Sequence, residues 1–312
     1  RVLDTSGTVI ARASLKLLSE GTGAVRNMSS DATGGFVFNA VQPGIYTLQV
    51  EHSGFKKFEK KGLTLTASEA LPVGDIRLEL GSISESITVR SEGAVVQTAS
   101  GERSGVITSS EVENLTVISR DFSVLITLQP GVVLEPGAEV QGFGGNSTFY
   151  ALGGRNTNNN ITLDGVSTEN TNSSNTNVFI SMDAVQTVKV LVSNFQAEFG
   201  RKPGAGVQAI TKSGTRQFHG LAYYYKRHEM FNANDFFNNR NGVAQTPYRY
   251  TTAGYNLGGP LYIPRTFNRH RDKLFFFFSQ EFQRESRPQA IRQLTTPTLS
   301  ERRGDFSDSR DT

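Results

Sequence analysis

The C-terminal third of the chain alternates apolar and polar residues over segments of about ten residues, the length of a membrane-spanning strand. Eighteen of the thirty aromatic residues follow Lys212. The alternating segments cover residues 219–227, 251–261 and 273–284. In the last segment, one face holds Leu274, Phe276, Phe278, Gln280 and Phe282, and the other holds Phe275, Phe277, Ser279, Glu281 and Gln283.

This alternation predicts β-strands with one face toward lipid and the other toward a lumen. In water, so dense a set of exposed Phe and Tyr side chains would promote aggregation. The longest uninterrupted apolar run, Leu274–Phe278, is far shorter than the roughly 20 residues that a membrane helix needs. Any membrane span is therefore expected to be β. Only three or four such strands fit before Thr312, so we expect an incomplete barrel.

Residues 1–80 contain short extended segments separated by Gly, Pro and Asp turns. Spacings near ten residues are typical of a small antiparallel sandwich. The sequence begins at Arg1 without the charged and apolar regions of a signal peptide. Residues 1–7 read as the tail of a strand entering a turn, so we expect the chain to be truncated there. The expected strands are Ser14–Leu18, Val25–Ser29, Gly35–Asn39, Tyr46–Glu51, Phe55–Lys60 and Ile76–Leu80.

Three motifs follow one another in this region. They read DATGGFVF at residues 31–38, VQPGIYTL at residues 41–48 and SGF at residues 53–55. In this order they resemble the carboxypeptidase regulatory-like module, and the match covers most of residues 1–80. The resemblance implies a prealbumin-like β-sandwich.

Four further motifs occur in order between Phe149 and Thr215. Physically they are a Gly-Gly turn, a strand ending in a tight Asp-Gly turn, a strand with period two and a final strand. They read Gly153-Gly154-Arg155, Leu163-Asp164-Gly165-Val166, Val188-Lys189-Val190 and GAGVQAITK at residues 204–212.

This succession resembles the second half of the plug domain of TonB-dependent outer-membrane receptors. The resemblance implies that Gly153, Gly154, Arg155, Asp164 and Gly165 are plug-motif residues. Two positions depart from the family pattern. Residue 189 is a lysine where the family has an acid, and residue 208 is a glutamine where it has asparagine.

Other segments extend the resemblance. Residues 109–113 read as a short helix start, and Arg120–Ile126 has helical spacing before Pro130 and Gly131 end it. The plug family has a similar run. The tail at residues 296–307 resembles a loop of Oar-like receptors, which also carry the regulatory-like module.

Residues 81–98 read as a linker that contains one isolated extended pentamer. In the receptor family, a segment at this place, the TonB box, pairs as an added strand with an energising periplasmic protein. The alternative is that the pentamer is the last strand of the sandwich. The candidate TonB box is Glu85, Ser86, Ile87, Thr88 and Val89.

Asparagine is concentrated between residues 156 and 177, which hold eight of them. One interpretation is a flexible polar loop. The other is an apex that contacts sugar or peptide, in which Asn158, Asn159 and Asn160 would face the ligand.

Enzyme motifs are present but poorly placed. S-x-x-K at residues 53–56, S-x-N at 173–175 and K-S-G at 212–214 follow the order of penicillin-recognising serine enzymes. That chemistry needs Ser and Lys on one helix face, whereas the flanks of Gly54 are strand-like. The GxGxxA at residues 204–209 lacks the following helix of a dinucleotide site.

The four histidines show no metal-ligand spacing, and the chain has no cysteine. We therefore expect no catalytic residue, no cofactor and no metal. The net charge of +3 is too small to indicate nucleic acid binding. The short basic runs at residues 269–271 and 302–303 are expected in loops or at lipid headgroups.

The sequence thus predicts a mainly β protein in three parts. They are a prealbumin-like β-sandwich (1–80), an α+β plug (99–215) and the first strands of an incomplete transmembrane β-barrel (216–312), with a linker at 81–98. The resemblance implies an outer-membrane receptor in which a TonB-type protein remodels the plug. Its ligand would be a carbohydrate, peptide or chelate, and outer-membrane lipid would surround the barrel. The alternative is an adhesion protein that binds carbohydrate or peptide without transport.

Overall fold

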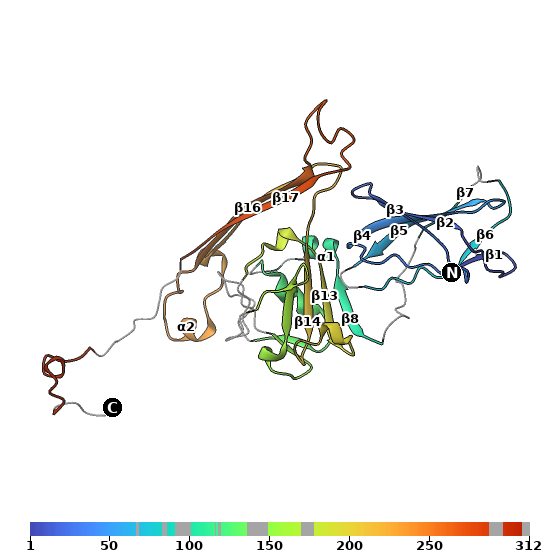
Figure 1. Ribbon diagram of the computed structural model, residues 1–312. Coiled ribbons are helices and arrows are strands. Elements are labelled where there is room, and N and C mark those ends of the chain that lie inside the picture. Colours follow the sequence, from blue (N-terminus) through green and yellow to red (C-terminus); the bar gives the residue numbers. More distant parts are fainter. Residues whose placement is uncertain are drawn as a thin grey trace. The chain divides into compact units, whose positions relative to one another are not determined.

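The structure is a computed structural model that describes residues 1–66, 69–82, 86–90, 101–115, 117, 120–135, 149–169, 178–286 and 296–307 (Figure 1). The chain divides into two units, residues 1–224 with 252–283, and residues 225–251 with 284–312. The described residues form five sheets and a few short helices, which confirms a mainly β fold. Within them, no helix is both long and apolar enough to cross a membrane.

The N-terminal module contains a five-stranded sheet in the order β3-β2-β4-β5-β7. A second, two-stranded parallel sheet pairs β1 (Val2–Asp4) with β6 (Ile76–Leu78). The five strands are β2 (Ser14–Ser19), β3 (Val25–Ser29), β4 (Gly44–Glu51), β5 (Lys57–Leu65) and β7 (Ser86–Arg90).

Aliphatic side chains from both sheets form the core of this module. Leu15, Leu48 and Ile76 are almost completely buried, as the alternation along each strand predicts. Each such side chain contributes about 1.5–3 kcal/mol through its removal from water. The expected strand at Gly35–Asn39 is wrong, because these five described residues form no strand. Its Phe36 and Phe38 nevertheless pack against the core, and this packing produces the period-two pattern.

The carboxylate of Asp31 organises the turn before this segment. Its Oδ1 accepts hydrogen bonds from the Thr33 backbone N–H, the Thr33 hydroxyl and the Gly35 backbone N–H, each at 2.8 Å. These bonds, chiefly that of the Thr33 hydroxyl, hold the pKa of Asp31 below its ordinary value of 3.8. The DxxG motif is therefore a turn whose geometry depends on an ionised side chain.

Because the pKa of Asp31 is lowered, the stability of the module depends on pH. Because the carboxylate is favoured in the folded state, its contribution is present above pH about 4 and is lost as the pH falls through the folded pKa. We expect Asp31→Asn to lower the melting temperature of residues 1–98 at pH 7 and to reduce its loss below pH 4. Thermal unfolding of both proteins across this pH range measures the effect. Equal melting temperatures at pH 7 would contradict it.

The plug has a five-stranded sheet in the order β12-β11-β14-β13-β8. Figure 1 shows β8, β13 and β14 side by side. A small separate sheet pairs β9 (Val132–Leu134) with β10 (Phe149–Ala151). The five strands are β8 (Arg103–Ile107), β11 (Asn160–Leu163), β12 (Val166–Ser167), β13 (Val185–Ser193) and β14 (Gly206–Thr211).

Three short helices contribute buried side chains to the plug core. They are α1 (Ser109–Asn114), η1 (Phe122–Leu128) and η4 (Met182–Ala184), whereas η3 (Asn156–Asn158) and η5 (Ala197–Phe199) bury no residue. α1 begins at a capping box in which Thr108 and Glu111 bond each other's backbone N–H groups. The run expected to be helical from Arg120 is a 3₁₀-helix that begins two residues later. The plug core lies between these helices and the sheet valines, of which Val188, Val190 and Val207 are completely buried.

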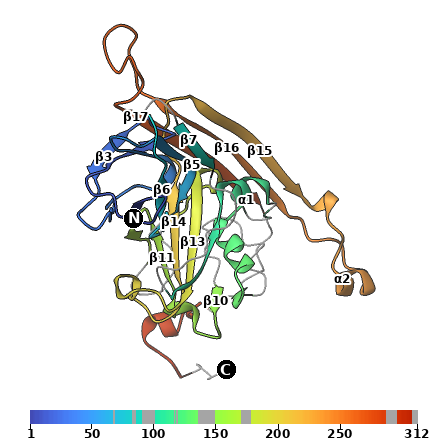
Figure 2. The same ribbon diagram turned by 90° about the vertical axis from the view of Figure 1, so that its right-hand side faces the viewer.

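Three long strands follow the plug in the sheet order β15-β16-β17, and Figure 2 shows them side by side. They are β15 (His219–His228), β16 (Arg249–Pro260) and β17 (Phe275–Ser286), close to the expected bounds. Exposure alternates along β16 and β17, as expected, whereas most residues of β15 are exposed on both faces. On β16, Tyr250 and Thr252 are buried while Tyr255 is exposed, and on β17 Phe278 and Phe282 are exposed.

The connection from β15 to β16 belongs to the second unit. It contains η6 (Glu229–Phe231) and α2 (Phe236–Arg240), and η7 (Glu301–Arg303) lies further along the chain. Arg249 donates through Nε and Nη2 to Glu229 at 3.2 and 3.1 Å. These bonds lower the pKa of Glu229 to about 2. An ion pair therefore closes the base of this connection.

Candidate functional site

The Gly153-Gly154-Arg155 motif forms the turn that follows β10. Leu152 and Gly153 both have positive φ, of 49° and 73°. The Gly154 N–H donates to the Ala151 carbonyl at 2.9 Å. Arg155 is the exposed residue that precedes η3. The motif therefore reverses the chain at the end of the small sheet.

The Asp164-Gly165 motif forms the tight turn between β11 and β12. Both residues have positive φ, of 47° and 84°, which a two-residue hairpin turn of type I′ requires. The Asp164 carboxylate accepts hydrogen bonds from the Thr211 backbone N–H at 2.9 Å and the Thr211 hydroxyl at 2.8 Å. The motif thus fixes the hairpin to the end of β14, which explains why an acidic residue suits this position.

The three asparagines expected to face ligand have different surroundings. Asn159 is buried, with 2% of its surface exposed. Its Nδ2 donates to the Phe149 carbonyl at 2.8 Å and its Oδ1 accepts from the Ala205 N–H at 3.0 Å. Asn159 therefore connects β10 to the start of β14, with both ends of its amide bonded to backbone. Asn158 and Asn160 are half-buried, and for them a ligand-facing role stays a prediction.

Most of the candidate TonB box lies on the sandwich. Residues 86–90 form β7, which pairs in parallel with β5 over the register Lys57↔Ser86 to Lys61↔Arg90. Glu85 lies outside the described residues. β7 is at the end of the sheet order, and no described strand pairs with its outer edge. Residues 86–89 of the candidate box therefore belong to a strand at the edge of the described sandwich sheet.

This pairing predicts the effect of a proline in the strand. Proline removes a backbone donor and fixes φ, so Ile87→Pro should disrupt β7. We expect the free energy of unfolding of residues 1–98 to fall by about 1–3 kcal/mol. Thermal melts of the variant and of Thr88→Ala, a control at an exposed position of the same strand, test this. An unchanged melting temperature for Ile87→Pro would show that β7 adds nothing to the module.

A polar cluster joins the plug to the three long strands. We call the sheet of β15, β16 and β17 the wall, and we call this group of residues the plug–wall cluster. It consists of Arg120, Ser181, Asp183, Tyr223 and Glu281. Arg120 forms an ion pair with Asp183 within the plug. The Arg120 guanidinium lies 5.1 Å from the centroid of the Tyr223 ring.

Hydrogen bonds complete this cluster. The Tyr223 hydroxyl on β15 donates to the Glu281 carboxylate on β17 at 2.6 Å. The Ser181 hydroxyl, at the start of η4, donates to the same carboxylate at 3.0 Å and lies 2.9 Å from the Tyr223 hydroxyl. The contact between plug and wall is thus made by polar groups that can exchange each other for water. Each hydrogen bond contributes about 0.5–3 kcal/mol net to stability.

Two backbone features make room for the cluster. Arg120 has a φ of 55°, a strained value for a residue with a side chain. Gly254 on β16 lies beneath Tyr223, and a Cβ there would be 2.4 Å from the Tyr223 hydroxyl oxygen. Gly254 is therefore required so that Tyr223 can cross β16 and reach Glu281 on β17.

Gly214 has a comparable role where the chain leaves the plug. A Cβ at this position would lie 2.3 Å from the Phe276 carbonyl oxygen and 2.7 Å from that of Gly259. The chain therefore crosses directly over the backbone of β16 and β17. This close approach accounts for the glycine of the K-S-G motif without any catalytic role.

Lys189, one of the two departures from the family pattern, forms a buried ion pair. Its Nζ lies 2.8 Å from Oε1 of Glu102, and the two side chains are only 3% and 4% exposed. The Ser104 hydroxyl also donates to Glu102 at 3.0 Å. Lys189 alternates with Val188 and Val190, so it lies on the sheet face opposite the plug core. The base on β13 is therefore matched by an acid that directly precedes β8 in the chain.

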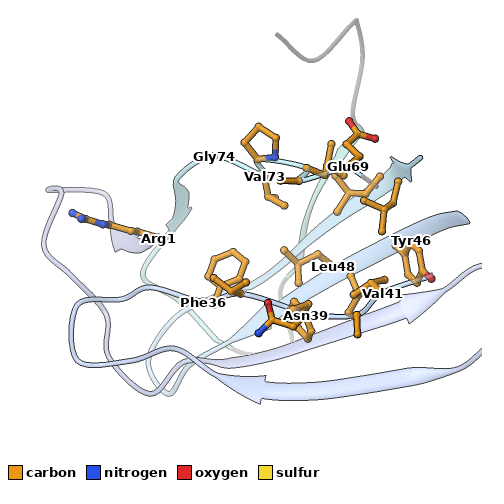
Figure 3. Close-up of a pocket in the computed structure, with 18 of the residues that line it drawn as sticks. Arg1, Phe36, Asn39, Val41, Tyr46, Leu48, Glu69, Val73 and Gly74 are labelled. Atoms are coloured by element: carbon orange, nitrogen blue, oxygen red, sulfur yellow. The ribbon is translucent and has the colours of Figure 1, made fainter. Parts of the chain in front are cut away.

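The sandwich also contains a cavity of about 630 Å³, shown in Figure 3. Its walls are mainly apolar, including Phe36, Val41 and Leu48, with Arg1 toward one end and Glu69 toward the other. The Glu69 carboxylate already accepts two hydrogen bonds from Thr66. None of the candidate site residues lines this cavity.

The enzyme motifs have no supporting geometry in the described residues. Ser53 and Gly54 lie in a turn, Gly54 with a φ of 82°, so Ser53 and Lys56 do not share a helix face. The S-x-N motif lies outside the described residues. The glycines of GxGxxA lead into β14, and no helix follows there. Among the described residues, no group of His, Asp or Glu could hold a metal ion.

Comparison with known protein families agrees with this architecture. Residues 1–79 match the carboxypeptidase regulatory-like domain, residues 97–207 match the TonB-dependent receptor plug domain, and residues 210–312 match an outer membrane β-barrel domain. Among curated proteins, the chain is 23% identical over 202 residues to the TonB-dependent transporter Oar of Myxococcus xanthus. That alignment covers 62% of this chain and 18% of Oar.

Solved receptors show partial structural likeness. The siderophore receptor PirA of Acinetobacter baumannii is 20% identical, with a TM-score of 0.41 over 58% of this chain and 24% of its own. The outer membrane transporter YddB of Escherichia coli is 16% identical, with a TM-score of 0.41 over 51% of this chain and 24% of its own. The chain thus spans about a quarter or less of the length of these relatives.

The three domain matches, in this order, place the chain in the TonB-dependent outer-membrane receptor and transporter family. It is a plug-and-barrel protein of the outer membrane. Within the family it is Oar-like, because a regulatory-like domain precedes the plug and the chain matches Oar over 202 residues. None of these likenesses favours the adhesion alternative.

Proposed function

We propose that this chain supplies the gate of an energised transporter, in which the plug closes a barrel until a TonB-type protein remodels it. The observation that carries this proposal is the plug–wall cluster. An apolar seal of the same extent would expose apolar surface to water whenever it opened. Polar groups instead exchange their partners for water at a small net cost in free energy. A contact made by Ser181, Tyr223 and Glu281 is therefore suited to repeated opening.

The position of β7 supports the coupling partner. An edge strand offers unpaired backbone N–H and C=O groups, to which a strand of another protein can add. β7 also lies in the chain just before the plug, so a partner bound there could act on the plug through residues 91–101. We infer that a periplasmic TonB-type protein adds a strand to the outer edge of β7, while β7 stays paired with β5.

Ligand recognition is assigned to two half-buried asparagines of the plug. Asn158 ends η3 and Asn160 begins β11, and their amide groups can bond the oxygens of a carbohydrate, a peptide or a chelate. Asn159 is excluded from this set because both ends of its amide are already bonded to backbone. The proposed ligand is thus one recognised by hydrogen bonds rather than by charge.

The absence of cysteine allows a direct test of the coupling site. In a receptor with a complete barrel, Thr88→Cys places a single thiol on β7, and Thr64→Cys places one on the exposed part of β5. We expect disulfide cross-linking to single-cysteine variants of the TonB-type protein at residue 88 and not at residue 64. Cross-linking should increase when the membrane is energised. Equal cross-linking at both residues, or none at either, would contradict the proposal.

A further inference from the structure

The connection between β16 and β17, residues 261–274, is long and basic. It contains Arg265, Arg269, Arg271 and Lys273 against the single acid Asp272, and all five are exposed. It lies at the end of the strands where the chain leaves the plug, because β15 begins and β16 ends there. We call these residues the basic turn.

Asn268 gives the basic turn a fixed backbone. It is buried, with 4% of its surface exposed. Its Nδ2 donates to the carbonyls of Leu261 and Leu274, both at 2.9 Å, and its Oδ1 accepts from the N–H groups of Asp272 at 2.9 Å and Lys273 at 3.0 Å. Asn268 is thus bonded to both arms of the turn. The charged side chains are therefore displayed from an ordered frame, which reduces the entropy lost on binding.

Aromatic side chains lie at the base of the basic turn. Phe218 lies 6.2 Å from Tyr262 and 6.4 Å from Phe276, measured between ring centroids. Phe276 belongs to the face of β17 that also carries the exposed Phe278, the face expected toward lipid. The Arg271 guanidinium lies 4.7 Å from the centroid of the Tyr262 ring. A cation is therefore held on the aromatic group at the edge of the lipid-facing surface.

Exposed apolar residues are interleaved with the cations. Leu261, Ile263, Phe267 and Leu274 are between 39% and 56% exposed. Aromatic rings and long basic side chains are the residues that proteins place at the boundary between hydrocarbon and headgroups. An acidic protein would match the charges but would leave these apolar groups without a function.

We propose that the basic turn binds the phosphate groups of anionic phospholipid headgroups in the adjoining leaflet. Arg269, Arg271 and Lys273 pair with the phosphates, and the interleaved apolar side chains enter the region of the upper acyl chains. The turn then fixes this end of the strands, where the chain leaves the plug, at the membrane surface. This role is independent of plug gating.

The test uses Thr266→Cys, which carries the only thiol in the chain, labelled with a fluorescent donor. A receptor with a complete barrel is placed in phosphatidylcholine vesicles that contain a small, equal fraction of acceptor-labelled phosphatidylglycerol or acceptor-labelled phosphatidylethanolamine. We expect several-fold more energy transfer to phosphatidylglycerol, decreasing as salt is added.

The triple variant Arg269→Gln/Arg271→Gln/Lys273→Gln should abolish this preference. Arg240→Gln, a change at an exposed arginine of α2 in the other connection, should leave it intact. Asn268→Ala keeps every charge but removes the four hydrogen bonds that hold the backbone of the basic turn. It should therefore reduce the preference for phosphatidylglycerol. Equal transfer to the two lipids, or a preference that survives the triple variant, would overturn the proposal. So would a preference displaced by a soluble acidic peptide at matched ionic strength, since that outcome assigns the turn to a protein partner.

Discussion

Replacing Lys189 with methionine is expected to lower the free energy of unfolding of the plug by about 3–5 kcal/mol. Methionine keeps the length of the side chain but removes the cation that lies 2.8 Å from the buried Glu102 carboxylate. Breaking a buried ion pair by removing one partner is far more costly than breaking a surface pair. Urea unfolding of residues 1–215, which contain the whole plug sheet, measures the change.

Two further variants separate burial from simple charge loss. The double variant Glu102→Gln/Lys189→Met removes both charges and should recover most of the lost stability. Glu113→Gln removes the partner of Lys212 at the same 2.8 Å separation, but Glu113 is 52% exposed, so the cost should stay within about 1 kcal/mol. Similar losses of unfolding free energy for Lys189→Met and Glu113→Gln would mean that the buried pair stabilises the plug no more than an exposed pair does.

Gly254→Val is expected to release the plug from the wall. The added side chain occupies the space of the Tyr223 hydroxyl group, so Tyr223 can no longer reach Glu281 and Ser181. Overpacking of this kind costs about 1–3 kcal/mol, which is roughly a factor of 5 to 150 in the population of released plug. Ion conductance of the complete receptor in a planar bilayer should rise accordingly.

Control variants of this experiment distinguish the cluster from general damage to the barrel. Ala222→Val adds the same kind of bulk to an exposed position of β15, on the opposite face of that strand from Tyr223, and should leave conductance unchanged. Tyr223→Phe keeps the ring over Gly254 but removes the hydroxyl, so it should give a smaller increase than Gly254→Val. Conductance that rises equally in all three variants would contradict a role for the cluster.

Much of the fold could be predicted from the sequence because it is encoded locally. The strands of the sandwich, the plug and the wall follow from period-two alternation and from turn residues, and the structure places them within a few residues of their expected ends. The segment Gly35–Asn39 shows where this reasoning fails. Phe36 and Phe38 alternate as a strand would, but alternation reports burial on one side and cannot report whether a neighbouring strand is present.

The plug–wall cluster could not be predicted, because its partners are distant in sequence. Arg120 and Asp183 are 63 residues apart, and Ser181 and Glu281 are 100 residues apart. Only indirect signals existed, namely the position of Arg120 in a plug-like run and a glycine in the middle of an alternating strand. Lys189 is similar. The sequence shows it as a departure from the family, and the structure explains it through Glu102.

The sheet order of the plug has a mechanical consequence. Among the described strands, β8 lies at the edge of the sheet and pairs with β13 alone, so its removal breaks one ladder, whereas removal of β13 breaks two. β8 is also the first described strand of the plug, and its first residue pairs with Ser193 at the far end of β13. Tension arriving along the chain from the N-terminal side is therefore delivered to the strand that detaches most easily. Rupture would begin at that end of the ladder and proceed toward Ile107, while β11, β12 and β14 remain assembled.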